Sequence, residues 1–117
     1  MDTCFLLCKE QKTGIAFMKI VYNSFLPFPG YAAIMLFGRI FARKKYKPLS
    51  RITINHEAIH DAQASDCGGY WRYYWKYLKQ WVKYGYRESP FEREAYANER
   101  NMNYLQTRTA EAWTRYE

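Results

Sequence analysis

The chain has only two histidines, and they stand four residues apart in the segment N-H-E-A-I-H at positions 55–60. Residues i and i+4 lie on one face of an α-helix, so a helix brings both imidazoles together. Ser50 is a favourable N-cap before this segment, and a Gly-Gly pair follows it where helices commonly end. The pattern therefore predicts a helix from Ser50 to about Ser65, with His56 and His60 side by side.

The H-E-x-x-H spacing is typical of zinc sites, because two imidazoles on one helical face can bind the same ion. Zinc lowers the pKa of a bound water to about 7. Glu57 follows His56 directly and is the residue expected to take that proton and pass it to a leaving amine. We therefore expect Zn²⁺ as the cofactor and Glu57 as the general base. The plain alternative is a pair of ordinary histidines on a helix surface.

A catalytic zinc site takes three protein ligands and leaves a fourth position to water. Asp66 follows His60 by six residues, but Gln63 stands where a glycine would have to turn the chain back. Asp66 then lies about 240° around the helix from His60, which argues against it. Glu92, on a separate predicted helix, is favoured instead. Two neighbouring carboxylates remain open for the same role: Glu88 and Glu94.

Glu92 also has a purely structural interpretation. The segment S-P-F-E at 89–92 has the pattern of a helix start, in which Ser89 is the N-cap and Glu92 completes a capping box. The helix that begins here is expected to continue through Leu105 and on toward Trp113. Another class of site would pair the histidines with Cys4 and Cys8 as structural zinc ligands, although forty-seven residues separate the two pairs.

Composition limits the class of protein. The chain has 117 residues, a net charge of +7 and three cysteines, which are too few for a disulfide framework. No run of about 18 apolar residues predicts a membrane-spanning helix, and the N-terminus lacks the pattern of a secretion signal. These features predict one domain with reduced thiols and a cytoplasmic location. Residues 1–17 are expected to be an extension outside the core, with Met18 as an alternative start.

The segment F-E-R-E-A-Y at 91–96 resembles the F-E-x-x-A-D motif of the membrane-associated prenyl-protein and heat-shock metallopeptidases, which are zincins of the glutamate class. The resemblance implies that Glu92 is the third metal ligand and that Glu57 is catalytic. Tyr96 stands where that family has Asp. The whole layout, from about Met18 to Arg108, is also similar to short, uncharacterised bacterial zincin-like proteins.

The resemblance implies an α+β fold, in which short strands or a hairpin precede three helices, and a peptide or protein substrate. An apolar stretch from Tyr31 to Phe41 and a shorter one from Lys19 to Tyr22 are the predicted strands. In zincins the strand before the metal helix often lies at the sheet edge and pairs with extended peptide, which points to Ala32–Ala42. Three residues are candidates for stabilising an oxyanion or orienting the ligands: Gln63, Arg93 and Tyr96.

The segment Tyr70–Tyr84 predicts an amphipathic helix with a cationic stripe beside an apolar one. The basic stripe is Arg72, Lys76, Lys79 and Lys83, and the apolar stripe one position earlier is Trp71, Trp75, Leu78 and Val82. In the simplest interpretation the apolar stripe packs on the core and the cations face solvent. The same residues suit an anionic membrane surface or, less well, single-stranded nucleic acid.

Two functions follow from the sequence. The first is a zinc-dependent metallohydrolase, most simply a peptidase, with Glu57 as its base. The second is a non-catalytic module that binds a membrane surface or nucleic acid through basic and aromatic side chains, with a structural or vestigial metal.

Overall fold

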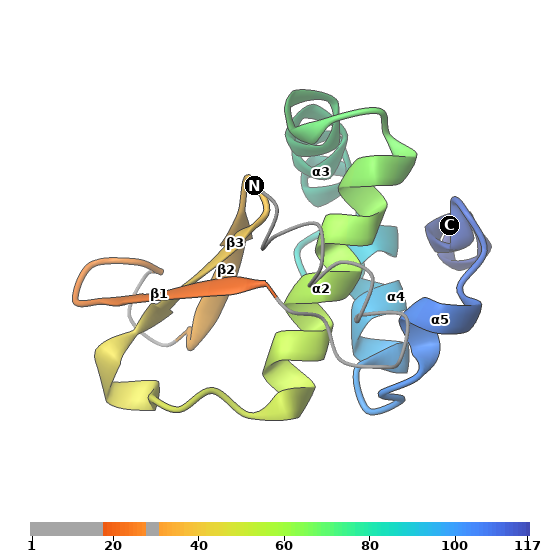
Figure 1. Ribbon diagram of the computed structural model, residues 1–117. Coiled ribbons are helices and arrows are strands. Elements are labelled where there is room, and N and C mark those ends of the chain that lie inside the picture. The colour runs from red at the N-terminus through yellow and green to blue at the C-terminus, as the bar shows by residue number, and fades with distance from the viewer. Residues whose placement is uncertain (1–17, 28–30) are drawn as a thin grey trace.

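The computed structural model describes residues 18–27 and 31–117 of the chain. Its first part is a sheet of three strands, β1 (Lys19–Asn23), β2 (Ala33–Leu36) and β3 (Arg39–Arg43), in the order β1-β3-β2. β1 runs parallel to β3 and β2 antiparallel to it, so β2 is an edge strand. The sheet precedes the helices in the chain and packs on one side of them (Figure 1), which confirms the predicted α+β class.

The apolar stretch predicted as one strand from Tyr31 to Phe41 is a hairpin, which corrects that prediction. Phe37 and Gly38 lie between β2 and β3 with φ values of 51° and 83°. Both values are in the left-handed region that tight two-residue hairpin turns use. A Cβ added to Gly38 would lie 2.7 Å from the hydroxyl of Tyr70, so the turn also needs glycine for space.

The two longest helices, which follow the sheet, begin and end close to the predicted positions. A short 3₁₀ helix, η2 (Lys44–Tyr46), leads into α2 (Arg51–Asp66). The side chain of Ser50 caps α2 by accepting a hydrogen bond from the Thr53 backbone N–H at 3.1 Å. α3 (Tyr70–Tyr84) has the predicted bounds. None of the helices in the described part of the chain is long and apolar enough to span a bilayer.

α3 packs on the protein with a different face from the one expected. The apolar stripe of tryptophans, leucine and valine faces solvent, and the inner face carries tyrosines. The Tyr77 hydroxyl donates to Glu92 at 2.6 Å. The Tyr74 hydroxyl accepts a hydrogen bond from the Phe37 backbone N–H at 2.9 Å. Tyrosine can be buried when its hydroxyl has a partner, and these partners exist only on the inner side.

α4 (Pro90–Asn98) is shorter than the helix predicted to run through Leu105 toward Trp113. The C-terminal end of α4 is bound by Asn55 of α2, which is fully buried. Its side chain binds the carbonyl oxygens that a helix end leaves free. Its Nδ2 lies 3.4, 2.8 and 3.1 Å from the carbonyl oxygens of Asn98, Glu99 and Asn101. Beyond this end, the chain forms two short elements, α5 (Tyr104–Thr107) and η3 (Ala112–Tyr116).

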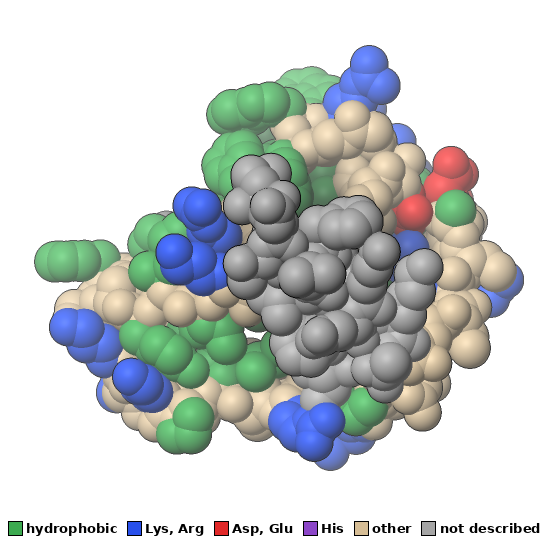
Figure 2. Space-filling view, viewed as in Figure 1, with side chains coloured by type: hydrophobic (Ala, Val, Ile, Leu, Met, Phe, Trp, Pro, Cys, Tyr) green, Lys and Arg blue, Asp and Glu red, His purple; other side chains and the backbone are tan. Residues whose placement is uncertain are grey.

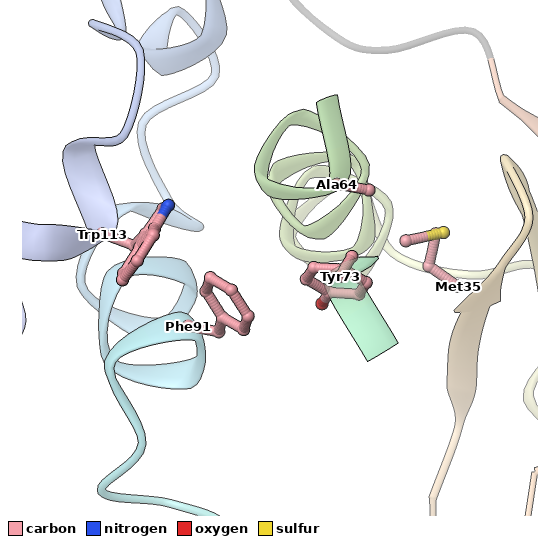
Figure 3. Packing of buried hydrophobic residues seen from close by; sticks show 5 residues of the cluster. All are labelled: Met35, Ala64, Tyr73, Phe91 and Trp113. Atoms are coloured by element: carbon pink, nitrogen blue, oxygen red, sulfur yellow. The ribbon is translucent and has the colours of Figure 1, made fainter. Parts of the chain in front are cut away.

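A band of buried apolar side chains joins β2, α2, α3, α4 and η3 (Figure 3). Its members are Met35, Ala64, Tyr73, Phe91 and Trp113. The Phe91 ring is fully buried, with its centroid 4.9 Å from that of Tyr73 and 5.0 Å from that of Trp113. Because Phe91 precedes Glu92, this packing holds the first turn of α4 in place against α2 and α3.

Candidate metal centre

His56 and His60 lie side by side on the buried face of α2. Their ring centroids are 4.9 Å apart, and the Nε2 atoms of the two rings face each other at 3.2 Å. Both residues are almost completely removed from solvent. The four-residue spacing therefore brings two imidazole nitrogens to one point inside the protein.

Glu92, in the first turn of α4, brings a carboxylate to the same point. Its Oε1 lies 3.2 Å from Nε2 of His56, and its Oε2 lies 3.2 Å from Nε2 of His60. A tetrahedral zinc ion with bonds of about 2.0–2.1 Å holds its donor atoms roughly 3.4 Å apart. The observed separations therefore fit the size of a zinc ion shared by two imidazoles and one carboxylate.

Glu92 reaches this point because it does not cap its own helix. Ser89 and Glu92 form no capping box: the Ser89 hydroxyl donates to the Tyr86 carbonyl at 3.0 Å instead. The backbone N–H of Phe91 is bound by Oε1 of Gln80, from α3, at 3.0 Å. The capping-box prediction was wrong: Gln80 accepts from an N–H that the Ser89 side chain would cap, and the Tyr86 carbonyl accepts from the Ser89 N–H at 3.4 Å, so the Glu92 side chain is left available.

The second nitrogen of His56 has an acceptor of its own. Nδ1 of His56 lies 2.8 Å from Oε1 of Glu99, and an ionised carboxylate can only accept. Nδ1 therefore carries the proton, and the Nε2 lone pair points into the cluster. A carboxylate behind a histidine is a common outer partner at zinc sites, where it fixes the ring and raises its basicity.

Gln63 plays the same role for His60. Its Oε1 lies 2.9 Å from Nδ1 of His60. Its amide nitrogen lies 2.9 Å from both the Phe91 carbonyl and Oε1 of Glu94, so the amide orientation is fixed by two acceptors. Gln63 must then accept from Nδ1–H of His60, so in the neutral ring the Nε2 lone pair also points into the cluster.

Charge and burial oppose each other in the cluster. Burial alone would lower the pKa of His60, but the charge of Glu92 and its hydrogen bond raise it to about 9. Burial would raise the pKa of Glu92, but the charges of His60 and His56 together with their hydrogen bonds lower it. Tyr77 adds a hydrogen bond to the ionised form of Glu92. The metal-free cluster thus holds a proton where the three donors meet.

The other carboxylates considered as third ligands lie elsewhere. Glu94 is fully buried and is bound by Arg108, whose Nε lies 2.6 Å from its Oε2. Arg108 also binds Asp66 at 2.6 Å. Glu88 is exposed. Among the described residues, the metal-sized group of donors consists of His56, His60 and Glu92. Cys4 and Cys8 lie outside the described residues.

The cluster opens into a pocket of about 330 Å³ between β2 and α3. Glu57 lines this pocket together with the three donors, and the Met35 backbone hydrogen-bonds to its carboxylate. Burial raises the pKa of Glu57, and the positive charges of His60 and His56 offset part of that rise. Apart from these groups, the walls are mainly aliphatic and aromatic. They include Ala33, Ile34, Leu36, Tyr74, Trp81 and Tyr86.

Tyr96 and Arg93, two of the residues predicted to support the site, lie in different surroundings: Tyr96 contacts a histidine, and Arg93 lies outside the pocket. The Tyr96 ring packs against the His56 ring at 4.6 Å, and its hydroxyl lies 3.3 Å from that of Tyr86. Arg93 is exposed and donates to the carbonyl of Tyr116 at 2.7 Å, so it points toward the C-terminal segment and does not line the pocket. In this position Arg93 is not among the pocket residues that could contact an oxyanion.

Sequence reasoning missed several residues that hold the site. Glu99 follows Glu92 by seven residues and Tyr96 by three, so helical spacing around α4 was a signal that could have found it. Tyr77 and Gln80 gave no comparable signal, because their roles depend on how α3 packs. The four basic residues of α3 are exposed and do not line the pocket: Arg72, Lys76, Lys79 and Lys83.

Comparison of the chain with protein families, with curated proteins and with solved structures finds no match.

Proposed function

We propose that the protein is a zinc-dependent hydrolase that cleaves peptide bonds, with His56, His60 and Glu92 as the metal ligands. The observation that carries the proposal is the meeting of two buried imidazoles and a buried carboxylate: the two Nε2 atoms are 3.2 Å apart, and each lies 3.2 Å from one oxygen of Glu92. Each donor residue is held from behind by a separate partner: Glu99, Gln63 and Tyr77. This arrangement orients the lone pairs toward one ion.

Two features favour a catalytic site over a structural one. Structural zinc sites are closed by four protein ligands, whereas catalytic sites keep an open position. Here the metal-sized group found among the described residues supplies three ligands, and it borders a pocket rather than solid core. The alternative function, a non-catalytic binding module with a structural or vestigial metal, gives no reason for a pocket beside the metal ligands.

Glu57 supplies the acid–base chemistry in this proposal. A zinc ion at the site would acidify a water molecule and polarise a substrate carbonyl. Glu57 borders the same pocket from the helix that carries both histidines, and its carboxylate is held by the Met35 backbone. From there, it takes the proton of the attacking water and returns it to the amine that leaves.

The edge strand supports a peptide as the substrate. Among the residues that the structure describes, β2 pairs only with β3, and its other side, toward the pocket, carries backbone groups without a strand partner. An extended peptide can pair with such an edge, while apolar side chains enter the pocket between β2 and α3. Only β2 of the predicted Ala32–Ala42 stretch lies at the edge, since β3 is the central strand.

The test uses three glutamate variants of the zinc-loaded protein on a fluorogenic peptide library, with zinc content measured by mass spectrometry. Glu57→Gln should keep zinc and lose activity by about 10²–10⁴-fold, the usual contribution of a general base. Glu92→Gln should lose zinc. The exposed Glu88→Gln is the matched control and should retain both zinc and activity.

Full activity in Glu57→Gln would refute its role as the base. Full zinc occupancy in Glu92→Gln would refute the ligand set. If the wild-type protein binds zinc but cleaves no member of the library, the proposed peptidase activity is wrong.

A further inference from the structure

One face of α3 exposes large apolar side chains along its whole length. The exposed fractions are 77% for Trp71, 64% for Trp75, 45% for Leu78 and 81% for Val82. These residues follow helical spacing, so they form a continuous stripe about 17 Å long. Figure 2 shows hydrophobic side chains gathered over the part of the molecule where Figure 1 places α3. Contiguous exposed patches of this kind commonly mark an interaction surface.

A cationic stripe runs beside the apolar one. Each basic residue follows an apolar residue by one position and therefore lies about 100° further around the helix. The stripe contains Arg72, Lys76, Lys79 and Lys83, all exposed. α3 has no acidic residue in its fifteen positions. The helix therefore presents an apolar face next to a positive face that has no acidic residue of its own.

The apolar face continues toward the mouth of the pocket. Phe37, at the tip of the β2–β3 hairpin, is half exposed, and its ring lies 5.3 Å from that of Trp71. On the same side of α3, Trp81 is half exposed and also lines the pocket. The apolar face and the pocket mouth therefore belong to one side of the protein.

We propose that this face of α3 docks on an anionic membrane surface, with the apolar stripe in the headgroup region and the cationic stripe against lipid phosphates. Tryptophan is favoured at that depth because its ring is apolar and its N–H is polar. Anionic lipids supply the countercharge that α3 itself lacks, and each nearby Lys or Arg strengthens the attraction. The proposal does not depend on the zinc chemistry.

Two other occupants fit the surface less well. A second copy docked through α3 would bring two helices without acidic residues together, so the lysines would face like charges. Single-stranded nucleic acid binds through base stacking on aromatic rings. Leu78 and Val82 occupy half of the apolar stripe and offer no ring for stacking, whereas both suit a lipid interface.

The test is co-sedimentation of the protein with vesicles of phosphatidylcholine alone or of equal parts phosphatidylcholine and phosphatidylglycerol. The double variant Trp71→Gln/Trp75→Gln removes apolar surface, and Lys79→Gln/Lys83→Gln removes two charges. Lys44→Gln/Lys45→Gln removes the same charge from η2, which lies at the opposite end of the molecule from α3 (Figure 1). All the replaced side chains are exposed, and thermal unfolding checks that each variant folds.

We expect wild type to bind the anionic vesicles and to be released in about 0.5 M salt, where screening shortens the reach of charges to about 4 Å. Both α3 variants should bind at least about tenfold more weakly, and the η2 variant within about twofold of wild type. Equal losses in both lysine variants would reduce the effect to net charge and overturn the proposal. Absence of vesicle binding would also overturn the proposal. So would a wild-type dimer, or wild-type binding to an oligonucleotide, that Trp71→Gln/Trp75→Gln abolishes.

Discussion

Oε1 of Gln63 lies 2.9 Å from Nδ1 of His60, while the nitrogen of the same amide binds Glu94 and the Phe91 carbonyl. One side chain therefore connects a histidine of the proposed metal site to the ion pair between Glu94 and Arg108. Both ends are buried, so no solvent competes for these hydrogen bonds. The position of His60 depends on α4 and on the segment that carries Arg108, as well as on α2.

The first prediction concerns this connection. Gln63→Met keeps the approximate shape of the side chain and removes the hydrogen bond to His60. Zinc affinity should fall about 10–100-fold, the usual cost of losing an outer partner of a metal-binding histidine. Competition with a zinc chelator measures the change, and the exposed Gln106→Met is the matched control. Equal affinities in the two variants would show that Gln63 does not orient His60.

The second prediction concerns proton release. His60 has a pKa of about 9 in the metal-free protein, so it is protonated near pH 7.5, whereas a zinc ligand must be neutral. Zinc binding near that pH should release about one proton, and the apparent affinity should rise about tenfold per pH unit up to roughly pH 8.5. Calorimetry in buffers with different ionisation enthalpies measures the released protons. A binding enthalpy that is identical in every buffer would show that His60 is already neutral.

The third prediction concerns the end of α4. Asn55→Ala removes the amide that binds the carbonyls there and should lower the free energy of unfolding by about 2–3 kcal/mol. It should also weaken zinc binding, because Glu99 stands at that helix end and holds His56. Urea unfolding gives the first quantity and chelator competition the second. Asn103→Ala, at an exposed asparagine, should change neither by more than about 0.5 kcal/mol.

The fourth prediction compares two glycines with nearly equal φ, 83° at Gly38 and 85° at Gly85. A Cβ at Gly85 meets no atom within 4 Å, but Gly85 has φ 85° and ψ 167°, a conformation that is essentially restricted to glycine, so Gly85→Ala should lose about 1–3 kcal/mol through backbone strain alone. Gly38→Ala must also displace the Tyr70 hydroxyl, which donates to Asp61 at 2.7 Å. We expect a further loss of about 1 kcal/mol in unfolding free energy. A total loss in Gly38→Ala no larger than the about 1–2 kcal/mol of the left-handed backbone alone would mean that the turn accommodates a methyl group freely.

The parts of the fold set by local spacing could be predicted. The bounds of α3, the N-cap at Ser50 and the position of His56 beside His60 depend on neighbours within the same segment. The angle between Asp66 and His60 around their helix was enough to set Asp66 aside, and Asp66 binds Arg108 in the structure. These features need no knowledge of how distant segments meet.

The features that were missed depend on tertiary contacts or on weak local signals. The end of α4 is set by Asn55, which is 43 residues away from Asn98 in the chain. The inner face of α3 could not be chosen by hydrophobicity, because both of its faces are aromatic. The tyrosine face is buried because the hydroxyls find hydrogen-bond partners there, such as Glu92, which accepts from Tyr77. The Phe37–Gly38 turn was hidden inside an apolar run that lacks the polar residues usual in hairpin turns.

The two walls of the pocket come from different parts of the chain. The proposed ligands and their partners belong to α2, α3 and α4 with the residue that follows it, whereas β2 offers a wall and a backbone edge. Side chains such as Ile34 and Leu36 can therefore be exchanged without touching a donor atom. The backbone at position 35 can bind Glu57 with any residue there except proline, which lacks the N–H. On the proposed function, sequence selectivity and metal chemistry are separable properties of this protein, and grafting a different hairpin would redirect cleavage while the zinc affinity stays the same.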